Sequence, residues 1–99
     1  MILFIDTSNN RQTIVKLDNH EIIKTYKSPR SQEVLNLIDQ ILKRHKKTFK
    51  DISEIKINTG PGSFTGLRIG CAVANTLSYA LKIPINGQKP DTIVTPIYE

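Results

Sequence analysis

A glycine-rich stretch at residues 60–70, Gly-Pro-Gly-Ser-Phe-Thr-Gly-Leu-Arg-Ile-Gly, decides the fold of this 99-residue chain. Before it, apolar and polar residues alternate over 55–59, which predicts a strand. After it, the pattern predicts a helix over about residues 64–81, with Ser63 as the N-cap. Gly60 and Gly62 permit backbone angles that other residues avoid. The stretch therefore predicts a strand, a tight turn and a helix in succession.

The same stretch does not match the common phosphate-binding or catalytic turns. Its glycine spacing differs from that of a Walker A loop, and no Lys-Ser or Lys-Thr pair follows. The third glycine comes one residue too late for the dinucleotide-binding pattern, and the G-x-S-x-G elbow of hydrolases is absent. The free N–H groups at the helix start leave two interpretations open, an anion-binding turn or a purely structural one.

Working outward from this turn, short apolar runs predict the rest of a sheet. The runs at 2–5, 13–17 and 21–26 are separated by tight polar turns. They predict three strands in an antiparallel meander. A further strand is expected at 83–85, and residues 92–98 have an extended pattern.

A first helix is expected between the third and fourth strands. Ser31 is its candidate N-cap. Its apolar stripe repeats at helical spacing and consists of Val34, Leu37, Ile38, Ile41 and Leu42. The order βββαβαβ with two right-handed crossovers predicts an α/β fold, a five-stranded mixed sheet of order 3-2-1-4-5 with two main helices. This is the architecture of a single ribonuclease H-like or actin-like lobe. We expect the lobe to cover residues 1–87 and an extended tail to cover 88–99.

Charge and cysteine content limit the function classes. The net charge is +5, from 14 Lys and Arg against 9 Asp and Glu, and Cys71 is the single cysteine. One cysteine excludes an internal disulfide and a multi-cysteine zinc site. Because of this cysteine usage, we expect a protein of the reducing cytoplasm. No apolar run approaches the ~20 residues that span a bilayer. A cluster of cations consists of Lys43, Arg44, Lys46, Lys47 and Lys50. These cations either stabilise the end of a helix, where the dipole favours positive charge, or form a patch that faces RNA.

Small residues at every fourth position mark one side of the second helix: Gly66, Gly70, Ala74 and Ser78. Glycine within a helix costs roughly 1 kcal/mol relative to alanine, so a close contact should offset it. That contact is either the protein's own sheet or a helix of another chain, and the sequence leaves both open. Leu77 and Leu81 flank this ridge and would add apolar contact.

No group of residues predicts catalysis. Asp6 ends the first strand, where ribonuclease H-like nucleases place a metal-binding carboxylate, and Glu33 is a candidate second ligand. The fourth strand ends without an acid, so we expect Asp6 to hydrogen-bond the following turn. His20 and His45 have no evident Ser or Cys partner, and Cys71 is expected in the core. The sequence therefore predicts no catalytic residue, no metal and no cofactor.

Several stretches resemble the bacterial tRNA threonylcarbamoyladenosine biosynthesis family TsaB, also called YeaZ. The strongest resemblance is a signature loop that consists of Gly60, Pro61, Gly62, Ser63, Phe64, Thr65, Gly66 and Arg68, within the stretch that ends at Gly70. Residues 5–8, 31–35 and 83–87 are similar to the family's first turn, first helix start and fifth strand. The resemblance covers residues 1–87, and 95–98 is similar to a short stretch near the family's C-terminus. Family members usually have two such lobes, and this chain resembles the first.

The resemblance implies an actin-like ATPase fold in a non-catalytic, cytoplasmic role. In the family, such a subunit pairs with the catalytic protein TsaD and works with the ATPase TsaE, and tRNA is reached through the complex. A homodimer is a further option, and no membrane is involved. Because family members pair through two helices of this lobe, the resemblance implies a partner interface at Leu35, Ile38, Gly66, Gly70, Ala74, Leu77 and Ser78.

Two alternatives remain from the sequence. One is a ribonuclease H-like nucleic-acid-binding or nuclease domain, which a metal-dependent cleavage assay would distinguish. The other is a nucleotide-binding lobe that completes its cleft with a second chain, which calorimetry with ATP would test.

Overall fold

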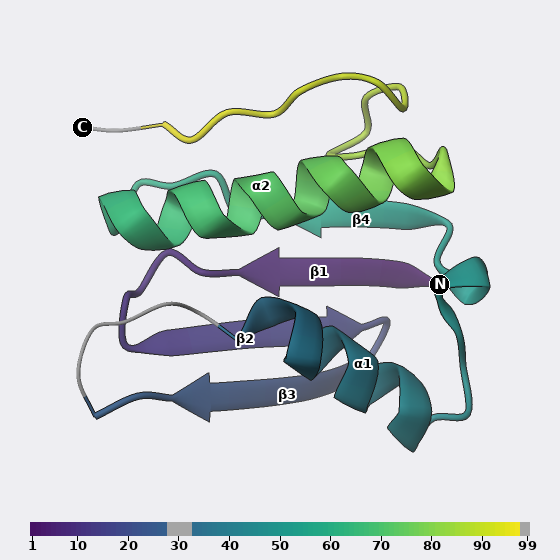
Figure 1. Ribbon diagram of the computed structural model, residues 1–99, viewed down its shortest axis with the longest axis horizontal. Helices are drawn as coiled ribbons and strands as arrows, with labels where there is room; N and C mark the ends of the chain where they lie inside the picture. The colour runs from purple at the N-terminus through teal and green to yellow at the C-terminus, as the bar shows by residue number, and fades with distance from the viewer. Residues whose placement is uncertain (28–32, 98–99) are drawn as a thin grey trace.

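The computed structural model describes residues 1–27 and 33–97, in which two helices cover a sheet (Figure 1). The strands are β1 (Ile2–Asp6), β2 (Gln12–Leu17), β3 (His20–Thr25) and β4 (Glu54–Ile57). The helices are α1 (Val34–Arg44) and α2 (Phe64–Leu81), and a short 3-10 helix, η1, lies at Phe49–Asp51. No helix in the described ranges is long and apolar enough to cross a membrane.

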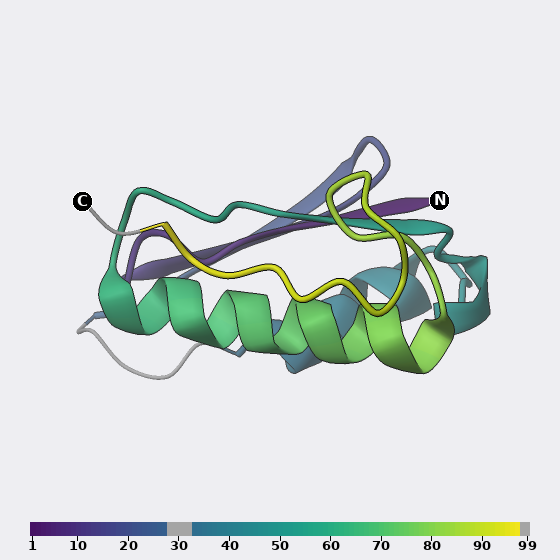
Figure 2. The same ribbon diagram turned by 90° about the horizontal axis from the view of Figure 1, so that it is seen from above.

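The described strands form one four-stranded sheet of order β3-β2-β1-β4. β1 pairs antiparallel with β2 and parallel with β4, and β2 pairs antiparallel with β3. Both helices lie on the same face of the sheet, as the two perpendicular views show (Figures 1 and 2). The α/β class, the antiparallel meander and the order of the first four strands are therefore confirmed.

The expected fifth strand is reduced to an isolated bridge, and the prediction of five strands is wrong. Ile85 bridges in parallel to Ile55, whose N–H donates to Pro84 O at 2.9 Å and whose carbonyl accepts from Asn86 N at 2.8 Å. The chain then turns away, because Asn86 and Gly87 have left-handed φ angles of 49° and 75° that no strand continues. The Asn86 side chain completes this edge, since its Oδ1 accepts from Ile57 N at 2.8 Å and its Nδ2 donates to Ile57 O at 3.1 Å.

The core lies between the sheet and the two helices. Alternate residues of β1, β2 and β4 point into it, as the two-residue period of a strand requires. The predicted stripe of α1 is confirmed as core and consists of Val34, Leu37, Ile38, Ile41 and Leu42. Cys71 of α2 is buried there too, and burial raises the pKa of its thiol, which confirms its prediction as a core residue.

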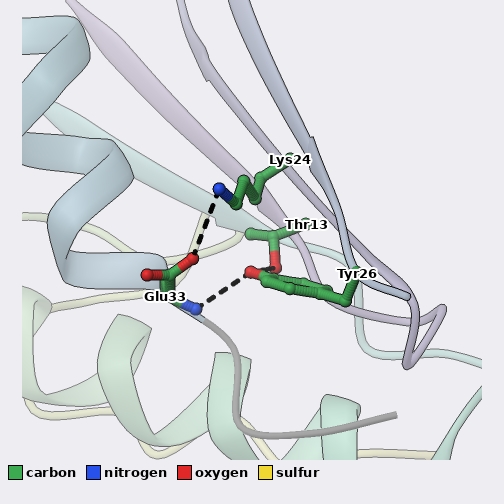
Figure 3. Close-up of polar contacts among 4 residues, drawn as sticks. All are labelled: Thr13, Lys24, Tyr26 and Glu33. Carbon is green, nitrogen blue, oxygen red and sulfur yellow. Dashed lines mark hydrogen bonds and ion pairs between the residues drawn. The ribbon is translucent and has the colours of Figure 1, made fainter. Parts of the chain in front are cut away.

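Tyr26 attaches the start of α1 to the sheet (Figure 3). Its hydroxyl lies 3.0 Å from Thr13 Oγ1 and accepts a hydrogen bond from Glu33 N at 3.0 Å. Lys24 Nζ lies 3.9 Å from Glu33 Oε2. These contacts fix the start of α1 against β2 and β3. The predicted N-cap, Ser31, lies outside the described residues.

Residues 88–97 run back along α2 toward the glycine-rich turn (Figures 1 and 2). Asn75 of α2 holds this tail, because its Nδ2 donates to Val94 O at 2.8 Å and its Oδ1 accepts from Val94 N at 2.9 Å. Near the end of the described tail, Ile97 N donates to Thr59 O at 2.7 Å. The tail is therefore tied to both α2 and the segment that follows β4.

Candidate functional site

The glycine-rich turn packs against the turn that follows β1. Ser63 N donates to Ser8 O at 2.7 Å. Asp6 holds Ser8 in place, because its Oδ1 accepts from Ser8 N at 2.9 Å and from Ser8 Oγ at 2.7 Å. The Asn58 amide donates to Ser8 Oγ at 3.4 Å. The expectation that Asp6 bonds the following turn is confirmed, and its carboxylate supports the two turns.

Gly60 and Gly62 are needed for different reasons. Gly60 has a φ of 114°, and a Cβ there would lie 2.6 Å from Ile97 O and 2.9 Å from Leu67 Cδ1. Gly62 does not have a left-handed φ, but a Cβ there would lie 2.6 Å from Ser8 O. We expected Gly62 to be required for its φ angle, but it is required because a side chain would collide with Ser8. The positive φ angle that favours glycine is found at Gly60.

Ser63 caps the N-terminus of α2. Ser63 Oγ accepts from Gly66 N at 3.3 Å, which confirms Ser63 as the N-cap, and Leu67 N donates to Ser63 O at 2.9 Å. The Ser63 cap occupies the Gly66 N–H group that an anion at this helix start would need, which favours the structural interpretation of the turn. The rest of the signature loop lies outward: Pro61 and Thr65 are exposed, and the Arg68 guanidinium lies 5.2 Å from the centre of the exposed Phe64 ring.

The small-residue ridge of α2 faces the protein's own sheet. All four of its residues are buried: Gly66, Gly70, Ala74 and Ser78. Thr7 Oγ1 donates to Gly66 O at 2.7 Å, and a Cβ at Gly70 would overlap Thr7 Oγ1 and lie 3.1 Å from Ile57 Cδ1. Ser78 Oγ donates to Ile83 O at 2.7 Å. Of the two contacts that the sequence left open for this ridge, the structure thus shows the one within the chain, made by the turn after β1, by β4 and by the segment after α2.

A different face of the helices carries exposed apolar side chains. Of the remaining residues expected at an interface, Leu35 is 56% exposed and Leu77 is half-buried, whereas Ile38 is buried in the core. Shallow hollows lie between α1 and α2 on this side. We call this surface the helix-face groove, and it is lined by Leu35, Ile69, Ala72, Val73, Thr76 and Leu77. Sequence reasoning missed four of these: Ile69, Ala72, Val73 and Thr76. The repeat of Ile69, Val73 and Leu77 at every fourth residue is a signal that would have found two of them, Ile69 and Val73.

The acidic and histidine candidates have other contacts. Within residues 1–27 and 33–97, no three His, Cys, Asp or Glu side chains lie where they would hold a metal ion together. Asp6 bonds Ser8, and Glu33 lies beside Lys24. The rings of His20 and His45 stack, with centroids 3.6 Å apart. Burial, followed by the charges of His20 and Arg44, lowers the pKa of His45 below its ordinary value.

The sequence of this chain is similar to those of known proteins. The model of the family described as "TsaD: tRNA N6-adenosine threonylcarbamoyltransferase" matches residues 25–87. The chain belongs to this family. The tRNA threonylcarbamoyladenosine biosynthesis protein TsaB of Bacillus subtilis is 34% identical over 113 aligned positions, which cover 99% of this chain and 49% of that protein. TsaB of Buchnera aphidicola from Schizaphis graminum is 36% identical over 88% of this chain and 43% of that protein. The resemblance to TsaB predicted from the glycine-rich stretch is confirmed.

Solved structures share the fold. YeaZ from Pseudomonas aeruginosa superposes with a TM-score of 0.71 at 24% identity, covering 85% of this chain and 41% of that one. A second structure, described as similar to peptidase YeaZ from Pseudomonas aeruginosa, gives a TM-score of 0.70 at 26% identity. The chain thus spans about half the length, or less, of the TsaB and YeaZ proteins that it matches.

Proposed function

We propose that this chain is a non-catalytic subunit in tRNA threonylcarbamoyladenosine biosynthesis, and that it docks onto a TsaD-like enzyme. The names of its TsaB relatives support the pathway, and the family match supports the kind of partner. The observation that carries the proposal is the helix-face groove.

The groove has the properties of a docking surface. Leu35 is 56% exposed and stands beside the half-buried Val73 and Leu77. A contiguous exposed apolar surface with a polar rim is typical of a protein interaction site. Asn36 and Thr76 supply polar groups at its border. Leu35 is the natural anchor, because a protruding apolar side chain gains most when a partner buries it.

The polar groups near the glycine-rich turn suit a structural role. The Asp6 carboxylate and the Ser8 hydroxyl bond each other, and Ser63 caps α2. Each of these groups therefore stabilises the lobe that presents the groove. A TsaE-like ATPase would join the assembled pair. Without the enzyme, two copies of the chain would close the groove on each other, since one patch can be self-complementary about a two-fold axis.

The test is co-purification with the TsaD-like protein of the same organism. Leu35→Arg and Ala72→Arg each place a cation in the groove at an exposed position, so the chain should stay folded. Burying an unpaired cation at the contact costs several kcal/mol, so binding should fall by at least about 100-fold. Gln40→Arg is the control, because Gln40 is an exposed residue of α1 that borders a different hollow beside β3.

Circular dichroism of each variant verifies the fold. If Leu35→Arg and Ala72→Arg are folded and bind like the wild-type chain, the groove is not the docking surface. An equal loss with Gln40→Arg would also contradict the proposal, because the effect would then not belong to the groove.

A further inference from the structure

A concentration of positive charge lies at the end of the molecule opposite the glycine-rich turn, where the chain leaves α1 and enters η1 (Figure 1). We define the basic patch as Lys43, Arg44, Lys46, Lys47 and Lys50. The segment 43–50 contains these five cations and no acidic residue. The chain carries 14 Lys and Arg in all, so a large share of its cations lies in one short segment.

The nearby carboxylates leave most of this charge unpaired. Asp39 Oδ2 lies 2.9 Å from Lys43 Nζ, and Asp51 Oδ2 accepts from Thr48 N at 2.8 Å. Within the part of the chain that the structure describes, no ion pair involves the four remaining cations: Arg44, Lys46, Lys47 and Lys50. All four are exposed. The patch therefore presents a positive field to solvent.

The end of α1 does not need these lysines. Its last carbonyls are capped by backbone groups, because Lys46 N donates to Lys43 O at 3.1 Å and Lys47 N donates to Leu42 O at 2.8 Å. Lys46 has the left-handed φ of 56° that such a helix end uses. The helix dipole acts within the last turn, so it accounts for Lys43 and Arg44 but not for Lys50 in η1.

Two stacked rings border the patch. His20 begins β3 and His45 follows α1, and their rings stack at an interplanar angle of 21°. The stack holds the β2–β3 turn beside the end of α1. Burial, His20 and Arg44 lower the pKa of His45, which favours a neutral ring. Cations next to flat rings are the combination that binds RNA, in which phosphates meet Lys and Arg while bases stack on planar side chains.

We propose that the basic patch binds the phosphate backbone of RNA, with the His20–His45 pair as a stacking surface. The choice of tRNA as the RNA rests on the proposed function, whereas the phosphate chemistry rests on the patch itself. Leu35 lies in the first turn of α1 and the patch begins at Lys43, about 12 Å further along the helix axis. The chain therefore has room to contact tRNA and a protein partner together.

The experiment measures binding of an unmodified tRNA transcript to the full chain by fluorescence anisotropy over a range of salt concentrations. Lys47→Gln with Lys50→Gln should weaken binding about tenfold and reduce the slope of log K against log salt by about two, since each lysine lost removes one phosphate contact. Lys56→Gln with Lys89→Gln removes the same charge from exposed positions outside the patch and should change little. His20→Ala should weaken binding without changing the salt slope.

Three results would overturn the proposal. The first is no salt-dependent tRNA binding by the wild-type chain. The second is an equal loss in the Lys56 and Lys89 control, which would indicate net charge rather than a site. The third is unchanged tRNA binding by the Lys47 and Lys50 variant together with lost co-purification of the TsaD-like protein, which would assign the patch to an acidic protein surface. Leu35→Arg should keep tRNA binding, so failure of the groove and failure of the patch are separate results.

Discussion

Replacing Gly70 by alanine tests whether the ridge of α2 exists to admit the turn after β1. A Cβ at this position would overlap Thr7 Oγ1 and lie 3.3 Å from Thr7 Cβ and 3.1 Å from Ile57 Cδ1. Thr7 is fully buried, and its hydroxyl is held by the bond to Gly66 O at 2.7 Å. The side chain therefore cannot move aside without losing a buried hydrogen bond.

Opposing effects determine how much Gly70→Ala changes the free energy of unfolding. Alanine in place of glycine favours a helix by roughly 1 kcal/mol. Against this, overpacking a core costs about 1–3 kcal/mol, and loss of the Thr7 hydrogen bond costs about 1 kcal/mol more. We expect Gly70→Ala to lower the free energy of unfolding by about 1–3 kcal/mol, which corresponds to a melting temperature lower by roughly 5–20 °C for a domain of this size.

A double-mutant cycle isolates the contact. Thr7→Ala removes the oxygen that the new methyl group would overlap, so Gly70→Ala should be nearly neutral, or stabilising, in the Thr7→Ala background. Urea denaturation followed by circular dichroism measures all four proteins, and Thr65→Ala at an exposed position of α2 is the control for alanine in this helix. The same loss from Gly70→Ala in both backgrounds would refute the reasoning, because the cost would then not come from Thr7.

Other substitutions and conditions test separate parts of the structure. Asn86→Ala should lower the free energy of unfolding by about 2 kcal/mol in urea titrations, because Ile57 loses both side-chain partners at the edge of β4. The pKa of His45 is lowered in the folded chain from 6.5, so the unfolded chain binds the proton first and stability should fall as the pH drops below that value. His45→Gln should make stability less dependent on pH there. Native Cys71 should react slowly with iodoacetamide until urea unfolds the chain, because burial raises the pKa of its thiol. The purified chain alone should transfer no threonylcarbamoyl group to tRNA, and turnover without a partner would contradict the non-catalytic role.

Local patterns predicted the elements, but side-chain geometry decided where the sheet ends. Both helices follow from periodicity, and the three strands of the meander follow from short apolar runs between polar turns. The run at 83–85 has the composition of a strand, yet the chain leaves the sheet at Asn86. The backbone of this asparagine has a left-handed φ angle, and its side-chain amide takes the place of a strand's backbone groups. The sequence alone does not distinguish such an asparagine from one in an ordinary turn. The apolar pattern alone therefore could not show that the chain leaves the sheet before a fifth strand forms.

The ridge of α2 shows why an interface is hard to assign from one helix. Small residues at every fourth position establish that something approaches closely, but they do not say which chain supplies it. Burial in the structure does, because Leu67 and Cys71, each one position after a ridge glycine, are buried together with the ridge. Together these positions form the inward face. Once that face is assigned to the core, a docking surface on α2 must lie on its other side, where Ala72 is exposed and Val73 is only partly covered.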